Sequence, residues 1–334
     1  MTRALPGPLR GLRLPVVAAP MFIVSSPELV IAQCKAGIVG SFPALNAREP
    51  EGAPPALEDW LARITEALAA HDAAHPDRPA APFAVNLIVH RSNTRLARDV
   101  EILRRWRVPI WITSLGARPE VFDAARAAGA LTLHDVTTNR FARKAIEKGA
   151  DGLIAVAAGA GGHAGAQSPF ALVPEIRAWF EGPLLLSGAI STGAALLAAR
   201  ALGADLGYVG SPFIATSEAN AANAYKRMIV ESGAEDIVTS ALFTGISGNY
   251  PRGSIERASL DPDDLPDPAA AADFGSGSAK PKAWSQVWGA GQGIGAVRAV
   301  TPAADVVARL ARDYAAAKAA LEADLDSPRA GRDR

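Results

Sequence analysis

The feature that most constrains the fold is a repeated alternation of short apolar runs with longer alanine-rich stretches. The runs are rich in β-branched residues, and the stretches between them have the composition of helices. Such alternation is typical of parallel β-α units. In chain order, the predicted strands are Pro15–Ala18, Ile38–Ser41, Phe83–Ile88, Pro109–Thr113, Leu131–His134, Gly152–Ala157, Leu184–Ser187 and Leu206–Gly210.

Three junctions between a helix and the next strand repeat one pattern. Gly129, Gly149 and Gly203 each follow a predicted helix, stand before an alanine and lead into a strand. A glycine at a left-handed helix cap, followed by a short turn, suits a helix that returns the chain to a parallel strand. Eight such strands within about 200 residues favour an α/β fold of the (β/α)8 TIM-barrel type. A doubly wound open sheet is the alternative.

The pattern changes after the eighth predicted strand. A helix is predicted over Glu218–Glu231, and Asp261–Asp273 is acidic and proline-rich. A long alanine-rich helix over Val306–Leu325 would serve as the eighth outer helix of the barrel. We therefore expect a barrel of residues 1–216 and 286–334, with a small lid-like insertion, 217–285, over the strand ends. Its aromatic residues Phe243, Tyr250 and Trp284 are expected to close over a site there.

Charge and cysteine content narrow the functional classes. The 334 residues carry 34 Lys and Arg against 34 Asp and Glu, a balance that argues against a nucleic-acid binder or a polybasic membrane protein. Cys34 is the single cysteine, so no intrachain disulfide is expected. No apolar run approaches the roughly 18 residues that span a bilayer, and the N-terminus lacks the apolar core of a signal peptide. A cytoplasmic enzyme is the expectation.

The segment Val156–Gly165, after the sixth predicted strand, is nearly free of large side chains. A bare backbone lets a flat ligand lie close to amide groups. His163 is the one reactive side chain on this segment, and an imidazole titrates near neutral pH. The sequence therefore predicts His163 as a general base. The alternative is an incidental histidine on a flexible loop.

Two other observations limit the chemistry. Gly159–Ala164 fits the dinucleotide pattern G-x-G-x-x-G/A, but it follows the sixth strand rather than the first of a βαβ unit, so we exclude it. Asp135 is the only acidic residue at a predicted strand end, which argues against a metal site or a glycosidase. His90 and His134 also stand at strand ends, and the sequence does not assign them a role.

The last two predicted strands end in segments suited to a phosphate. The seventh ends in Ser187-Gly188-Ala189 and leads into a helix, and the eighth ends in Gly210-Ser211. Barrels that bind phosphorylated ligands commonly hold the phosphate with these two loops. The alternative is a pair of tight turns that need glycine for the turn alone.

Six segments in this order resemble the nitronate monooxygenases, formerly called 2-nitropropane dioxygenases, over nearly the whole chain. They are Ala18–Phe22, Ala84–Leu87, Gly161–Gly165, Leu186–Ala189, Val209–Phe213 and Trp288–Gly293.

The resemblance implies an FMN cofactor across the barrel mouth, with His163 in the place of the family's catalytic histidine. By position, contacts to the flavin ring would come from Ala19, Pro20, Met21, Phe22, Asn86, Gly161 and Gly162, and from Gln292 at its edge. The phosphate would be held by Ser187, Gly188, Ala189, Gly210 and Ser211. Some members have a lysine within the stretch that here reads His134–Thr137, and some have an aspartate where Val156 stands.

The implied reaction is oxidation by O2 of alkyl nitronates, and also of nitroalkanes, to carbonyl compounds and nitrite. The partners are then a small-molecule substrate and O2; a homodimer is compatible with the sequence, which does not fix the oligomeric state. Two alternatives stay open. One is an NAD(P)H-dependent FMN reductase acting on quinones or enoyl thioesters, and the other is a non-catalytic flavin-binding barrel.

Overall fold

The computed structural model describes residues 4–48, 56–266 and 284–326. Eight parallel strands follow one another in the order β1-β9-β8-β6-β5-β4-β3-β2. A parallel bridge between Val17 and Val39 joins the two edges and closes the sheet into a barrel. The strands are β1 (Val16–Ala18), β2 (Gly40–Pro43), β3 (Phe83–Ile88), β4 (Ile110–Ser114), β5 (Leu131–Val136), β6 (Gly152–Val156), β8 (Leu184–Ser187) and β9 (Leu206–Val209).

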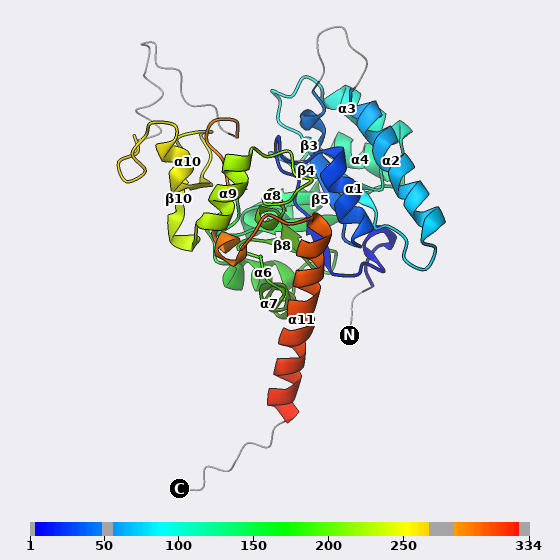
Figure 1. Cartoon of the computed structure of the whole chain (residues 1–334). Coiled ribbons are helices and arrows are strands. Elements are labelled where there is room, and N and C mark those ends of the chain that lie inside the picture. Colours follow the sequence, from blue (N-terminus) through cyan, green and yellow to red (C-terminus); the bar gives the residue numbers. More distant parts are fainter. Residues whose placement is uncertain (1–3, 49–55, 267–283, 327–334) are drawn as a thin grey trace.

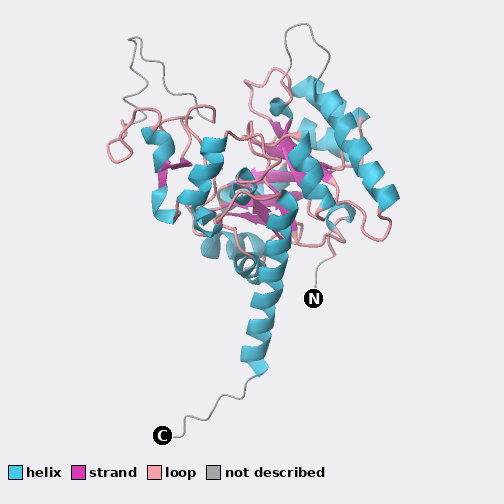
Figure 2. Cartoon of the chain, in the orientation of Figure 1, coloured by secondary structure: helices cyan, strands magenta, loops and turns pink. Residues whose placement is uncertain are grey.

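Helices surround this barrel, as Figures 1 and 2 show. The outer helices are α1 (Pro27–Lys35), α2 (Ala56–Ala74), α3 (Leu96–Arg105), α4 (Pro119–Ala127), α5 (Asn139–Glu147), α6 (Pro169–Arg177), α7 (Gly193–Ala201) and α11 (Ala303–Asp326). The predicted TIM barrel is confirmed, and the doubly wound sheet is wrong. The predicted strands differ from the observed ones by at most two residues at either end. Within the described residues, no helix is long and apolar enough to cross a membrane.

Side chains alternate along the strands, so they pack in turn inside the barrel and between the barrel and its helices. Inward-facing residues such as Ile110, Leu133 and Leu206 pack inside the barrel. Leu9, which precedes β1 in the chain, is buried in the same cluster. Residues that face outward pack against the helices. The interior is therefore packed with side chains, as barrels of this size require, and a ligand has room only at the strand ends.

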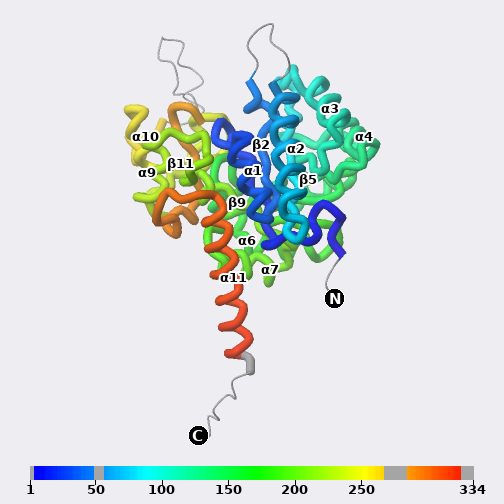
Figure 3. Tube along the Cα trace, turned by 45° about the vertical axis from the view of Figure 1, so that its right-hand side comes forward, coloured from blue at the N-terminus to red at the C-terminus, as the bar shows by residue number. Residues whose placement is uncertain are grey.

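The C-terminal helix α11 takes the place of the eighth outer helix. It packs between α7 and α1, and its distal half projects from the body (Figures 1 and 3). The crossing with α7 is closest at Gly193, where an added Cβ would lie 1.9 Å from the backbone nitrogen of Tyr314. Only glycine allows the two helices to approach this far.

The segment after β9 builds a second, smaller sheet. Strands β10 (Ile237–Ser240) and β11 (Gly248–Pro251) form an antiparallel pair, and β11 also pairs with β7 (Gly162–His163). With α9 (Asn223–Glu231) and α10 (Arg252–Glu256), they stand at one side of the barrel, away from α2–α4 (Figure 1).

One predicted helix boundary in this segment is wrong. The helix expected over Glu218–Glu231 begins only at Asn223, because the Glu218 carboxylate accepts hydrogen bonds from the backbone N–H of Ala303 at 3.0 and 3.1 Å. Glu218 thus satisfies a free N–H at the start of α11, where a negative charge also complements the helix dipole. Most of the acidic stretch Asp261–Asp273 lies outside the described residues.

Gly193→Ala tests the crossing of α7 and α11. Alanine is the better helix former by about 1 kcal/mol, but its methyl group would overlap the α11 backbone. We expect the free energy of unfolding to fall by about 1–3 kcal/mol, as in overpacked cores, measured by urea denaturation. Gly7→Ala is the control, because a Cβ there meets no atom within 4 Å. Unchanged or higher stability of Gly193→Ala would contradict the described packing.

Candidate active site

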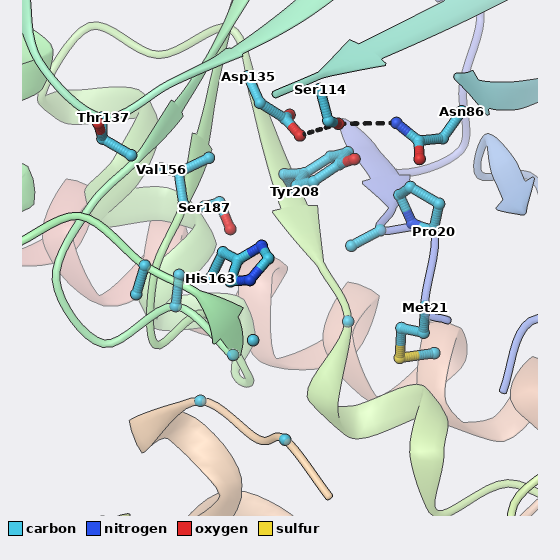
Figure 4. Close-up of a pocket in the computed structure, with 18 of the residues that line it drawn as sticks. Pro20, Met21, Asn86, Ser114, Asp135, Thr137, Val156, His163, Ser187 and Tyr208 are labelled. Carbon is cyan, nitrogen blue, oxygen red and sulfur yellow. Dashed lines mark hydrogen bonds between the residues drawn. The ribbon is translucent and has the colours of Figure 1, made fainter. Parts of the chain in front are cut away.

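The barrel strands present one layer of side chains at their C-terminal ends, just above the apolar interior. Because side chains alternate along a strand, each strand that contributes to the layer points one residue inward at this level. These residues form the floor of a cavity of about 830 Å³ (Figure 4). They are Asn86 on β3, Ser114 on β4, Asp135 on β5, Val156 on β6, Ser187 on β8 and Tyr208 on β9.

A directed chain of hydrogen bonds crosses the floor. The Asn86 amide donates from Nδ2 to Oγ of Ser114 at 2.8 Å, and Ser114 donates its hydroxyl proton to Oδ2 of Asp135 at 2.5 Å (Figure 4). Burial raises the pKa of the Asp135 carboxyl to about 6, against which the Ser114 hydrogen bond acts. The floor therefore carries a carboxyl group that titrates close to neutral pH.

The wall of the cavity opposite β1 is made of backbone. The carbonyl oxygen of Gly159 accepts hydrogen bonds from the N–H groups of Ala189, at 3.2 Å, and Gln292, at 3.0 Å. It therefore joins the loops after β6 and β8 to the segment that precedes α11. An added Cβ at Gly161 would lie 2.7 Å from the nitrogen of Gly291, so side chains are excluded where these loops meet. The result is a flat wall with few side chains.

The turn after β8 is unusual in its backbone. Gly188 has a φ of +147° and Ala189 a φ of +53°. A non-glycine residue in the left-handed region costs about 1–3 kcal/mol and occurs preferentially at ligand-binding positions. Ala189 lines the cavity, so this strained turn borders the site.

The loop after β1 forms the facing wall and is held by one asparagine. Asn46 accepts a hydrogen bond from the Ile23 N–H and donates to the carbonyl oxygens of Met21 and Ser25, all between 2.9 and 3.0 Å. Pro20 and Met21 are thereby presented to the cavity (Figure 4).

His163 lies on the rim of this cavity in the two-residue strand β7. It pairs with Gly248 of β11, and its neighbour Gly162 pairs with Asn249. His163 is half-buried, and the indole of Trp284 packs edge-on against its imidazole with ring centroids 5.5 Å apart. These contacts of the small sheet support a defined position for His163.

The hydrogen bonds of His163 select one tautomer. Its Nε2 lies 3.0 Å from Oγ1 of Thr244, and that hydroxyl donates its single proton to the carbonyl oxygen of Ile246 at 3.0 Å. This arrangement favours the tautomer in which Nε2 carries the proton that Oγ1 accepts and Nδ1 keeps the lone pair. Desolvation also lowers the pKa of His163, so the imidazole is neutral at neutral pH. A neutral imidazole with a free lone pair can accept a proton.

The other two strand-end histidines are placed differently. His134 is buried, and its Nδ1 lies 2.6 Å from the hydroxyl of Thr113 while its ring packs edge-on against Phe122 of α4. Desolvation lowers its pKa to about 4. His90 is exposed and hydrogen-bonds Ser92. Neither has the supported position of His163.

The structure brings nearly all the predicted site residues to one cavity. Besides His163, the cavity is lined by Ala19, Pro20, Met21, Phe22, Asn86, Gly161, Gly162, Ser187, Gly188, Ala189, Gly210 and Ser211. Gln292 is the exception: its residue is exposed and is not among those that line the cavity. It acts instead through its backbone N–H, which donates to Gly159.

Some contributors to the site were not predicted. Thr244 carries no recognisable motif and lies 81 residues from His163 in the chain. Ser114 and Tyr208 stand at the ends of predicted strands, so the alternation of side chains could have identified them. Of the three aromatic residues expected as a cover, Trp284 lines the cavity, while Tyr250 and Phe243 pack behind it.

The residues present fit a flavin. A flat ring system can lie between the backbone wall and the loop after β1, where glycines leave space, and its polar edge can meet the amide, hydroxyl and carboxyl groups of the floor. Two buried polar atoms of that floor, Asp135 Oδ1 and the Tyr208 hydroxyl, have no hydrogen-bond partner in the part of the chain that the structure describes. A bound ligand can supply the missing hydrogen-bond partner of each atom.

Comparisons with known proteins agree with this geometry. A nitronate monooxygenase of Paraburkholderia phytofirmans is 27% identical, over 92% of this chain and 93% of that protein. A hydroxy-methyl-oxo-octahydroindene-carboxyl-CoA dehydrogenase of Mycobacterium tuberculosis is 28% identical, over 71% of this chain and 63% of that protein.

Solved structures give the same fold. Nitroalkane oxidase from Streptomyces ansochromogenes superposes with a TM-score of 0.71 at 26% identity, covering 92% of this chain and 97% of that one. FabK from Thermotoga maritima has a TM-score of 0.75 at 20% identity, covering 95% and 97%, and shows likeness of fold alone.

The family assignment rests on the extent of one match. The model of the family described as nitronate monooxygenase matches residues 8–313, which include every barrel strand, the glycine-rich wall and His163. The chain is therefore a flavin-dependent oxidoreductase that belongs to the nitronate monooxygenase family.

Proposed function

We propose that this protein binds FMN in the cavity and oxidises alkyl nitronates, and also nitroalkanes, with O2 to carbonyl compounds and nitrite. The observation that carries the proposal is the imidazole of His163, held on the small sheet beside a cavity with a wall of backbone. Family membership supports the same reaction.

The chain's own residues would position the cofactor. The backbone around Gly188, Ala189 and Gly210 and the hydroxyls of Ser187 and Ser211 would hold the phosphate and the adjoining chain. Pro20, Met21 and Asn86 would contact the ring system from the β1 and β3 side. When bound, FMN supplies the electron acceptance that no side chain of the site provides.

His163 would handle the substrate proton. With Nε2–H directed at Thr244, Nδ1 is free to take the α-proton of a neutral nitroalkane. A nitronate has already lost that proton, so oxidation of this substrate would not need the base. We also propose that residues 217–285 act as a cover, because Trp284 and Thr244 from this segment both contact His163. A cover of this kind excludes water from the reacting atoms.

A second candidate function is an NAD(P)H-dependent reductase or dehydrogenase acting on thioesters. It is favoured by the similarity to the octahydroindene-carboxyl-CoA dehydrogenase of Mycobacterium tuberculosis. The same cavity and histidine would serve either reaction.

FMN identity is the first test of the proposal. The purified protein should be yellow and release on heating about one FMN per chain. One pair of turns, after β8 and β9, would hold one phosphate, and the sequence has no accepted dinucleotide-binding fingerprint that would hold an adenosine. Chromatography of the released cofactor distinguishes FMN from FAD. Recovery of FAD as the major cofactor would contradict the proposal.

Replacement of His163 tests the proposed base. In His163→Asn, nitroalkane turnover should fall by about 10²–10⁴-fold, the range for removal of a general base, with FMN retained. Nitronate turnover should fall less, because that substrate needs no proton abstraction. Nitrite release and oxygen consumption measure both.

Two histidine variants provide the control for this experiment. His90→Asn should leave both reactions unchanged, because His90 is exposed and hydrogen-bonds only a neighbouring serine in the described structure. His134→Asn alters a buried residue that borders the cavity, but its ring packs against Phe122 and hydrogen-bonds Thr113, so the change should affect stability more than turnover. A loss in either variant that exceeds the loss in His163→Asn would show that the base is assigned to the wrong histidine.

Thr244 tests the tautomer. Thr244→Val removes the acceptor of the Nε2 proton, so Nδ1 should no longer be the preferred basic nitrogen. One hydrogen bond contributes about 0.5–1.5 kcal/mol, so kcat for a nitroalkane should fall by up to about tenfold. Thr244→Ser, which keeps the hydroxyl, should retain wild-type kcat. Imidazole ¹⁵N chemical shifts report the tautomer directly, and an unchanged spectrum with unchanged kcat in Thr244→Val would refute the role.

A further inference from the structure

Two polar atoms in the floor of the cavity are buried without a hydrogen-bond partner in the described part of the chain: Oδ1 of Asp135 and the hydroxyl of Tyr208. Leaving such an atom unsatisfied costs about 1–3 kcal/mol, which makes it uncommon. Both residues line the same cavity, and Figure 4 shows their side chains next to each other. A ligand in this cavity would therefore meet two unsatisfied groups at once.

None of the strand residues that face Asp135 in the described part of the chain is basic: they are Asn86 on β3, Ser114 on β4, Val156 on β6 and Ser187 on β8. Tyr208 on β9 is a titratable neighbour, and burial, with a further contribution from the Asp135 charge, raises the pKa of its phenol.

Other basic groups line the same cavity. His163 hydrogen-bonds Thr244 and His134 hydrogen-bonds Thr113. The cations are Arg118, which pairs with Glu120, Lys148, which donates to the carbonyl oxygen of Ala117, and Lys144 of α5.

The single proton of Ser114 already goes to Oδ2 of Asp135. When ionised, Asp135 can then offer a ligand only an acceptor at Oδ1, whereas the neutral acid can donate an O–H. The carbonyl oxygens and two ring nitrogens of a flavin accept hydrogen bonds and would pair with the neutral acid, whereas its N3–H and ribityl hydroxyls donate and would pair with the ionised form. The neutral acid is favoured because an ionised Asp135 would be a second buried negative charge in the cavity that also takes the FMN phosphate.

We propose that Asp135 binds the flavin as a neutral carboxylic acid, so that the protein takes up a proton at Asp135 when the cofactor binds near neutral pH. This inference rests on the proposed FMN site, but not on the identity of the oxidised substrate. Asp135 is then the residue that makes cofactor affinity depend on pH.

The pKa of Asp135 in the free protein sets the direction in which cofactor affinity changes with pH. Burial raises the pKa of Asp135 to about 6 before any ligand binds, and a ligand that accepts its proton raises this pKa further. Below pH 6 the acid is already protonated and no uptake is needed. As pH rises above 6, ionisation of Asp135 in the free protein competes with flavin binding. The affinity of the wild-type protein for FMN therefore falls until the pH exceeds the pKa of Asp135 in the complex.

The test compares FMN affinity of the apoprotein and of Asp135→Asn between pH 5 and 8, by quenching of flavin fluorescence. Asparagine is neutral at every pH and still donates from its amide. The ratio of the wild-type Kd to the variant Kd should level off toward pH 5 and rise by about tenfold or more by pH 8, because each unit by which the flavin raises the pKa is a factor of ten. Titration of the FMN phosphate itself cancels in this ratio. A ratio that does not change with pH would overturn the proposal.

Tyr208→Phe is the matched control: it removes the neighbouring hydroxyl but keeps Asp135, so its affinity should retain the pH dependence of the wild type. If Tyr208→Phe loses that dependence, the assignment to Asp135 is wrong.

A second measurement needs only the wild-type protein and so does not depend on folding of a variant. Calorimetric titration with riboflavin, which lacks the phosphate, in two buffers of different ionisation enthalpy should give an uptake of about half to one proton per flavin at pH 7. No uptake, or proton release, would overturn the proposal. Proton uptake in a protein that fails to oxidise nitronates would support this inference and contradict the proposed substrate.

Discussion

The pairing of β7 with β11 is the interaction on which the site depends. It involves only Gly162 and His163 from the barrel loop, yet it converts a glycine-rich segment into the edge of a three-stranded sheet. The neighbouring contacts reinforce it, since Asn249 donates to the carbonyl oxygen of Ala160 at 2.7 Å. Without this sheet the imidazole would have no fixed direction, because nine of the eleven residues 156–166 are glycine or alanine and exert little steric control. The segment after β9 therefore contributes to the chemistry as well as to any cover over the cavity.

The barrel supplies the other half of the site through a simple geometric rule. Alternation of side chains puts apolar residues in the lower layers and polar residues in the last one, so the hydrogen-bonded chain from Asn86 through Ser114 to Asp135 spans three neighbouring strands. The two halves have different tasks. In the proposed function the floor would bind the cofactor, and the rim would present His163 to the substrate. Because they come from separate parts of the chain, substrate preference can change at the rim while the floor is preserved.

Most of the barrel was predictable from sequence, because each strand is marked by its own composition and by the turn residues next to it. Strands such as Phe83–Ile88 and Leu184–Ser187 are bounded by turn residues and have a composition that only a buried parallel strand explains. The cavity-lining residues after the strands follow from the same alternation and from the family resemblance. The two-residue strand β7 was not predictable, because no pattern in Gly162-His163 indicates its partner 85 residues away. Thr244 was missed for the same reason, and Glu218 was placed in a helix because its bond to Ala303 is also a long-range contact.

The central claim is that nitronate, rather than a reduced pyridine nucleotide, delivers electrons to the flavin in this cavity. The most direct measurement is the visible spectrum of the flavin-loaded protein under anaerobic conditions, recorded after addition of an alkyl nitronate and, in a separate sample, of NADH or NADPH. The account predicts rapid loss of the oxidised flavin absorbance with the nitronate, recovery on admission of air, and a slow or absent change with either nucleotide. Rapid bleaching by NADH or NADPH together with an unchanged spectrum in the presence of nitronate would contradict it.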